Sequence, residues 1–175
     1  MTRLRVVMAA LLLGLAGCGG DSSGDDDGGG GGGGGNNPPP RDLRPNVTGS
    51  YASTGTIQAV ALGQTQSMDV QDTVHIQAAE SSVSSLSIRS ETLSCDRDLS
   101  ATMTGETTFS VGQGSCEIAR VQDGKNCVVK LSVASGQGSR AAPGPLRLSL
   151  QGDFSTTCFL FPVSGQFTLD VTGTR

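Results

Sequence analysis

The sequence predicts an all-β domain, an antiparallel meander of about 8–10 strands that forms a small barrel or a two-layer sandwich. Three observations carry this prediction. From Asn46 onward, apolar residues recur at every second position, which is the period of a strand. Turn signals rich in glycine separate these runs, and no window keeps a helical stripe. Because the alternation leaves polar residues on the other side, we expect one face of the sheet to contact water.

The clearest strands are runs in which apolar residues alternate strictly, namely residues 86–88, 99–103, 127–133, 146–150 and 167–171. Weaker candidates are the segments VTGSYAS, TIQAVAL, SMDVQDTVHIQA, TTFSV and TCFLFPV. Only residues 79–87 would allow a helical turn. Asp123-Gly124 separates two apolar runs and is the strongest hairpin signal in the chain.

Ahead of the domain, residues 1–18 read MTRLRVVMAALLLGLAGC. Two arginines precede an apolar stretch from Val6 to Leu15, which has about half the length of a membrane span and is typical of a signal peptide. The end of this segment, Leu15-Ala16-Gly17-Cys18, resembles the lipobox of bacterial lipoproteins. The resemblance implies that residues 1–17 are removed and that Cys18 carries fatty acyl chains, of the palmitate kind, which hold the protein on a membrane.

This resemblance also implies a location in the cell envelope. Residue 19 is glycine and not aspartate, and in enteric bacteria an aspartate there tends to retain lipoproteins in the inner membrane. We therefore expect the outer membrane if the source has two membranes.

Residues 19–45 read GGDSSGDDDGGGGGGGGNNPPPRDLRP, and eleven of them are glycine. Such a segment has almost nothing apolar to bury, so residues 18–45 are expected to form a lipidated, disordered spacer with an r.m.s. span of roughly 30 Å. Gly20-Asp21-Ser22-Ser23-Gly24 matches the G-x-S-x-G pattern of serine hydrolases. That pattern requires a strained strand-to-helix turn, which a disordered spacer cannot supply. The predicted β domain is residues 46–175.

Gly49-Ser50-Tyr51 at the start of this domain resembles the G-x-W first strand of lipocalins, with tyrosine in the aromatic position. The resemblance implies a barrel that holds a small apolar ligand. Four phenylalanines are candidates to line such a site, although each could equally pack in the core: Phe109, Phe159, Phe161 and Phe167.

Apart from Cys18, the chain has four cysteines: Cys95, Cys116, Cys127 and Cys158. An even number beyond the cytoplasm predicts two disulfides. Cys116 and Cys127 flank the Asp-Gly hairpin, so one solution pairs them and leaves Cys95 with Cys158. The alternative joins Cys95 to Cys116 and Cys127 to Cys158, and the sequence leaves both open. No C-x-x-C spacing is present, so neither a zinc site nor redox catalysis is expected.

The sequence offers no catalytic machinery, cofactor site or metal site. His75 is the only histidine, and its neighbours Val74 and Ile76 place it on the wet face of a strand. The net charge of −4 and the lack of tryptophan argue against nucleic acid as a partner. We expect a non-enzymatic envelope lipoprotein that presents its β domain for a structural or interaction role. The alternative is a lipocalin-like carrier of a small apolar ligand, and a hydrolase with an unrecognised site is the least favoured reading.

Overall fold

The computed structural model describes residues 40–122, 125–157 and 162–175. The chain divides into two units, Met1–Asn37 and Pro38–Arg175, and all described residues belong to the second. This unit consists of a short 3₁₀ helix, η1 (Arg44–Asn46), and ten strands. The strands are β1 (Gly49–Ala61), β2 (Gln64–Ala78), β3 (Ser85–Ser90), β4 (Ser94–Cys95), β5 (Leu99–Met103), β6 (Thr108–Val111), β7 (Gly114–Gln122), β8 (Lys125–Ser139), β9 (Leu146–Thr156) and β10 (Val163–Thr174). Within the described residues, no helix is long and apolar enough to span a membrane.

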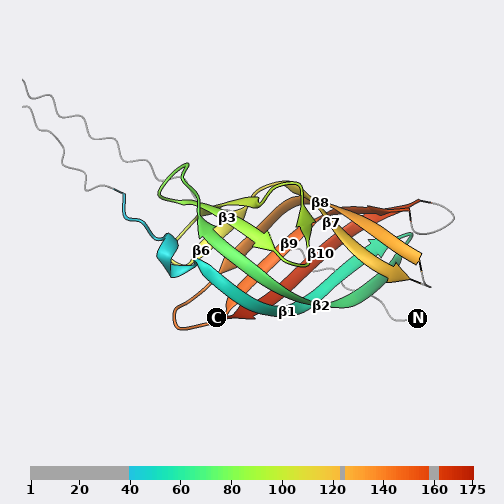
Figure 1. Ribbon diagram of the computed structural model, residues 1–175, viewed down its shortest axis with the longest axis horizontal. Helices are drawn as coiled ribbons and strands as arrows, with labels where there is room; N and C mark the ends of the chain where they lie inside the picture. Colours follow the sequence, from blue (N-terminus) through green and yellow to red (C-terminus); the bar gives the residue numbers. More distant parts are fainter. Residues whose placement is uncertain (1–39, 123–124, 158–161) are drawn as a thin grey trace, which may run out of the picture. The chain divides into compact units, whose positions relative to one another are not determined.

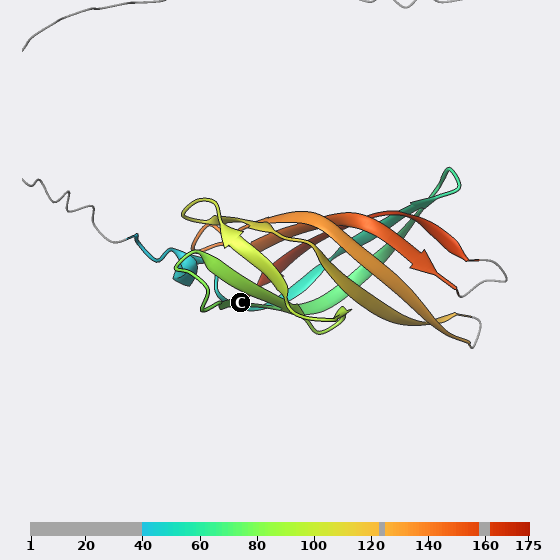
Figure 2. The same ribbon diagram turned by 90° about the horizontal axis from the view of Figure 1, so that it is seen from above.

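The strands form one antiparallel sheet in the order β4-β7-β8-β6-β5-β3-β2-β1-β10-β9, and β8 also pairs with β9. That additional pairing closes β8, β6, β5, β3, β2, β1, β10 and β9 into a ring (Figures 1 and 2). β7 continues the wall by pairing with β8, and β4 pairs with β7. The predicted all-β antiparallel fold and its strand number are confirmed. Between a barrel and a sandwich, the structure is a partly closed barrel.

Two hairpins account for the length of this barrel. β7 and β8 pair from Gly114↔Val133 to Gln122↔Lys125, which confirms the hairpin predicted from Asp123-Gly124, although those two turn residues lie outside the described part. β1 and β2 pair along their whole length from Gly49↔Ile76 to Ala61↔Gln64. At 13 residues, β1 extends about 40 Å from the η1 end to the opposite end.

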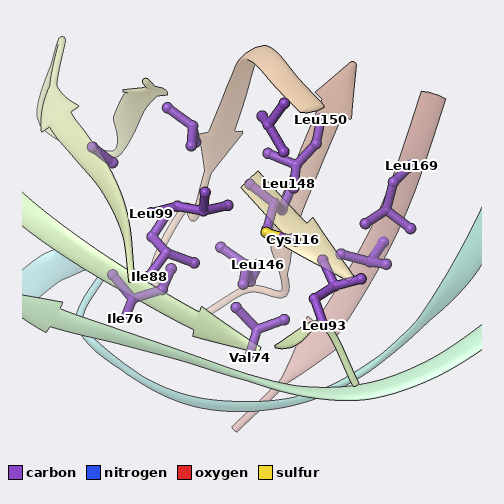
Figure 3. Packing of buried hydrophobic residues seen from close by; sticks show 14 of the residues in the cluster. Val74, Ile76, Ile88, Leu93, Leu99, Cys116, Leu146, Leu148, Leu150 and Leu169 are labelled. Atoms are coloured by element: carbon purple, nitrogen blue, oxygen red, sulfur yellow. The ribbon is translucent and has the colours of Figure 1, made fainter. Parts of the chain in front are cut away.

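The core lies inside the ring because the alternating apolar residues point inward. Figure 3 shows side chains from several strands meeting there, among them Val74, Ile88, Leu99, Leu148 and Leu169. All five are 5% exposed or less. Each buried aliphatic side chain contributes about 1.5–3 kcal/mol relative to exposure, so this interior core is a main source of the stability of the fold.

Tyr51 closes the η1 end of the interior. Its ring is fully buried, and its hydroxyl donates a hydrogen bond to the carbonyl of Val47 at 2.6 Å. The guanidinium groups of Arg140 and Arg175 lie 5.8 and 5.4 Å from the ring centroid, within the range of cation–π attraction. Arg140 also donates to the carbonyl of Asn46 at 2.7 Å. Tyr51 and the two arginines therefore pack together at the η1 end of the interior.

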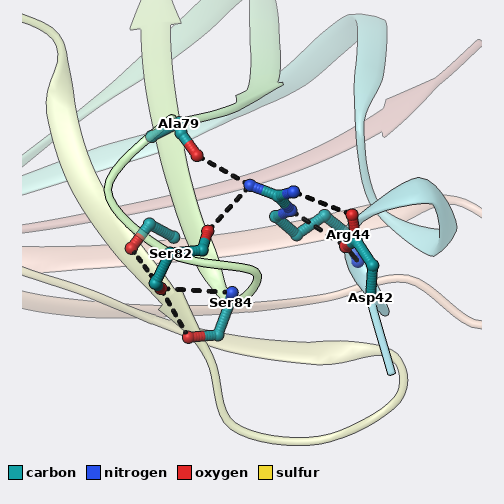
Figure 4. A network of polar contacts seen from close by, with 6 residues as sticks. Asp42, Arg44, Ala79, Ser82 and Ser84 are labelled. Atoms are coloured by element: carbon teal, nitrogen blue, oxygen red, sulfur yellow. Dashed lines mark hydrogen bonds and ion pairs between the residues drawn. The ribbon is translucent and has the colours of Figure 1, made fainter. Parts of the chain in front are cut away.

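The segment ahead of β1 is attached to the barrel by a polar network (Figure 4). Arg44 donates from Nη1 to the carbonyls of Ala79 and Ser82 at 2.7 and 2.8 Å, and it forms an ion pair with Asp42 at 2.7 Å. The hydrogen bond from Arg44 holds the pKa of the Asp42 carboxyl below its ordinary value. Contacts with the barrel therefore begin ahead of residue 46, where the sequence placed the start of the domain.

The structure forms a disulfide between Cys95 and Cys116, which lie directly opposite each other on β4 and β7. Pairing of Cys116 with Cys127 is therefore wrong. In the register of the β7–β8 hairpin, Cys127 faces Arg120, four residues along β7 from Cys116. That offset is about 13 Å, beyond the ~7 Å limit between the Cα atoms of a disulfide. Cys127 is buried, and Cys158 lies outside the described residues, so a Cys127–Cys158 bond stays a prediction.

Candidate functional site: an apolar cavity at the open end of the barrel

The barrel is closed in one half and open in the other, because the short strands β3, β4, β5 and β6 do not extend along its full length. β3 pairs with β2 only at residues 74–78, so in the described chain residues 64–73 of β2 pair with β1 alone. On the other side, residues 118–122 of β7 pair with β8 alone. We call the resulting gap between these two edges the seam.

A strap, residues 91–98, crosses from β2 to β7 where the seam begins. Asp72 on β2 accepts hydrogen bonds from the backbone N–H groups of Glu91 and Thr92 at 3.0 and 2.9 Å. At its other end, the strap is joined to β7 by the Cys95–Cys116 disulfide. Leu93, between these attachments, is 6% exposed and packs into the core. The strap therefore separates the packed half of the interior from the open half.

The open half contains a cavity of about 700 Å³. Inward-facing residues of β1, β2, β7, β8, β9 and β10 contribute most of its wall, namely Ile57, Ala59, Ala61, Met68, Ile118, Val129, Leu131, Phe154, Val163 and Phe167. Its described polar lining consists of Gln64, Gln66, Ser67 and Thr156. None of the lining residues in the described part of the chain is charged, so the cavity is suited to a neutral, apolar molecule.

The four phenylalanines proposed as lining residues have different places. Phe167 lines the cavity and is 3% exposed. Phe109 does not line this cavity; it packs in the closed half, where its ring occupies the space that a Cβ on Gly138 would need. Phe159 and Phe161 lie outside the described residues. Phe154 also lines the cavity, although the sequence did not predict it as a lining residue. Its even number on β9 places it on the same face as Leu146, Leu148 and Leu150, and this alternation could have indicated it.

His75 is on the outer face of β2, as the sequence predicted, but it is not isolated. Its Nδ1 lies 2.8 Å from Ser50 Oγ, and its Nε2 lies 3.2 Å from Glu91 Oε1. The hydrogen bond from His75 is the main cause that lowers the pKa of Glu91. Ser50 is brought opposite His75 by the β1–β2 register, and Glu91 belongs to the strap. Spacing along the chain could not show this cluster, whose clearest effect is to attach the strap to β2.

A second hollow of about 760 Å³ lies over β1, β6, β8, β9 and β10. Its lining is rich in threonine, serine and glycine, with Arg147 and Asp170 as its charged residues. The outward-facing threonines Thr54, Thr56 and Thr172 show that this hollow is a depression of the outer surface and not part of the interior. Three core side chains, Phe109, Leu148 and Val171, also contribute to its lining, but the rest of the lining is polar or glycine.

Across the described ranges, no group of three or more histidine, cysteine, aspartate or glutamate side chains could hold a metal ion. No family model matches the chain, and no curated protein matches it. A solved structure of a Bacteroides fragilis protein, described as an outer membrane protein, is similar at 13% identity with a TM-score of 0.40. The match covers 77% of this chain and 53% of that one, so this chain spans about half of that protein's length.

Proposed function

We propose that this protein is an envelope lipoprotein whose β domain binds a small, neutral, apolar molecule in the open end of its barrel. The observation that carries the proposal is the cavity of about 700 Å³ with an apolar wall. Ligand sites in proteins have volumes of roughly 300–1,000 Å³ and are mostly apolar, with a few polar groups that orient the ligand. Gln64 and Gln66 offer such groups at the end of β2.

The barrel supports this proposal in two further ways. A ring of about eight strands is just wide enough either to be filled by side chains or to hold one small ligand, and here the two halves differ. The η1 half is filled, with Tyr51, Phe109 and Leu146 all 1% exposed or less. The other half keeps its apolar wall without filling the space, although burying that wall by collapse would be favourable.

Binding can be tested with the neutral fluorescent probe N-phenyl-1-naphthylamine and the purified full chain. Ala59→Phe places a ring in the cavity without removing a core side chain, and it should weaken probe binding by about tenfold or more. Ala52→Phe is the matched control, since residue 52 is exposed on the opposite face of the same strand. Equal affinity in both variants would contradict the proposal, and thermal unfolding of each would verify that it folds.

Binding of another envelope protein is a second candidate function, and the open strand edges of the seam favour it. Along residues 64–70 of β2, the backbone groups on the side away from β1 have no strand partner in the described chain. Such an edge can accept an added strand from another protein. Hydrogen exchange tests this: these amides should exchange slowly in native envelope preparations and rapidly in the purified protein. Equally rapid exchange in both would remove this candidate.

A further inference from the structure

The tip of the β1–β2 hairpin combines two features that the fold does not need. Leu62 has a φ of +50°, and Gly63 follows with a φ of +74°, so both central residues of this two-residue turn are left-handed. Turns of this type favour Asn-Gly because a bulky side chain is strained in that conformation, at a cost of about 1–2 kcal/mol. The side chain of Leu62 is 91% exposed, so it gains no packing that would offset the strain.

The surroundings of Leu62 are also unusual for a protruding loop. Val60, two residues before Leu62, is 45% exposed. Between Arg44 and Asp69 the sequence contains no charged residue. The polar residues near the tip are neutral: Gln58, Gln64, Thr65, Gln66 and Ser67. Entry of the hairpin tip into a lipid surface would therefore desolvate no charge of this hairpin segment, and desolvation of charge is the largest obstacle to such a step.

The backbone of the tip suits shallow insertion. The Ala61↔Gln64 pair continues the β1–β2 ladder up to the two turn residues, so few backbone groups remain without a partner there. Leu62 also forms part of the cavity lining together with Ala61 and Gln64. A tip placed at the boundary between headgroups and acyl chains would bring the mouth of the cavity to the same depth.

We propose that the β1–β2 tip is a lipid-docking element in which Leu62 inserts into the surface of a bilayer. The partner of the tip is a bilayer and not a groove of another protein, because the tip is narrow, uncharged and continuous with a cavity suited to apolar molecules. Docking itself does not require the cavity to bind a ligand. Only the further step, transfer of a molecule between bilayer and cavity, rests on the proposed function.

The chain contains no tryptophan, so Leu62→Trp creates a single fluorescent reporter at the tip. With the full chain reconstituted on phosphatidylcholine vesicles, its emission should shift to shorter wavelength and be quenched by lipids brominated along the acyl chain. Val83→Trp is the matched control, since Val83 is 44% exposed in the β2–β3 loop beside Arg44, at the other end of β1. Its emission should stay that of a water-exposed indole. Unquenched emission from Leu62→Trp would overturn the proposal.

A second pair of variants tests Leu62 itself. Val60→Trp reports from beside the tip, and adding Leu62→Asn should remove its quenching while raising the midpoint of thermal unfolding, because asparagine suits the turn. Loss of quenching with a stable fold cannot be attributed to unfolding, and unchanged quenching would contradict the role of Leu62. Ala59→Phe, which fills the cavity, should leave the signal of Leu62→Trp unchanged. Quenching that disappears in high salt would indicate electrostatic adsorption and contradict apolar insertion.

Discussion

At the scale of single residues, close approaches inside the ring determine which side chains are permitted. Gly138 on β8 is buried, and a Cβ built on it would overlap the ring of Phe109 on β6. The two strands are paired in register at these residues, Phe109↔Gly138. A glycine is needed there because the outer atoms of the aromatic ring occupy the place that a Cβ would take.

Gly138→Ala should lower the free energy of unfolding by about 1–3 kcal/mol, because the added methyl group forces the ring of Phe109 out of its position. Chemical denaturation measures this. Gly105→Ala is the control, since the nearest atom to its Cβ is the rotatable hydroxyl of Thr108, and its effect should be within about 0.5 kcal/mol. Phe109→Leu combined with Gly138→Ala should cost less than the sum of the two single changes; an additive cost would contradict this packing.

The two remaining cysteines of the domain lead to a second prediction at the scale of single residues. With Cys95 and Cys116 joined, two disulfides require the bond between Cys127 and Cys158. The described β8–β9 register ends at Val129↔Thr156, and the predicted bond would require the same register to continue for two more residues. Peptide mapping by mass spectrometry without reduction should recover the linked peptides. Recovery of Cys127 as a thiol in exported protein would contradict it.

At the scale of elements, the strap shows how an open barrel keeps its edges in place. It contains only two strand residues, β4. On the β2 side it is held by the Asp72 hydrogen bonds and the His75–Glu91 contact. On the β7 side it is held by the β4–β7 pairing, by a hydrogen bond from the Asp96 N–H to the carbonyl of Ser115, and by the Cys95–Cys116 disulfide, which is the covalent attachment.

Replacing both Cys95 and Cys116 with alanine should lower the free energy of unfolding by about 3 kcal/mol, since the bond closes a loop with a sequence separation of 21. Denaturation under non-reducing conditions measures it. The strap amides from residue 93 to residue 98 should also exchange faster with solvent, while β9 and β10 remain protected. Uniform loss of protection across the sheet would show that the disulfide supports the whole ring and not the strap.

The segment around η1 gives a pH-dependent prediction. Because the pKa of Asp42 is lowered from an ordinary value of 3.8 in the folded protein, its contact with Arg44 contributes stability above that value. This contribution is lost as the pH falls through the lowered pKa. Below pH 3.8, the Arg44 Nε–H resonance should move toward that of a free guanidinium in NMR spectra. Asp42→Asn should show no such transition in this range, and a transition that persists in that variant would assign it to another group.

At the scale of the whole molecule, one half of the barrel is packed and the other is hollow, and the hollow half has the uncharged tip. The predicted lipid anchor at Cys18 would place this domain beside a membrane. The predicted anchor and the proposed insertion of the tip are independent of each other, since the first is covalent acylation of Cys18 and the second is a contact of the folded domain.

Cys18→Ala should release the protein from the membrane fraction or block its processing, because no acyl chain can then be attached. Fractionation of cells followed by intact-mass measurement tests this, and Cys18→Ser provides a nearly isosteric control that should behave in the same way. Unchanged membrane fractionation of both variants, with no acyl mass on the parent chain, would contradict the lipoprotein assignment.

The sequence by itself determined the strand content, because a period of two is a local property that each run carries within itself. It also determined the β7–β8 hairpin, since Asp-Gly encodes a tight turn. It could not determine that β8 pairs with β7 and then β6 along one edge while it pairs with β9 along the other. Those pairings join residues far apart in the chain, and they decide that Cys95 meets Cys116, that His75 lies between Ser50 and Glu91, and that one end of the barrel stays hollow.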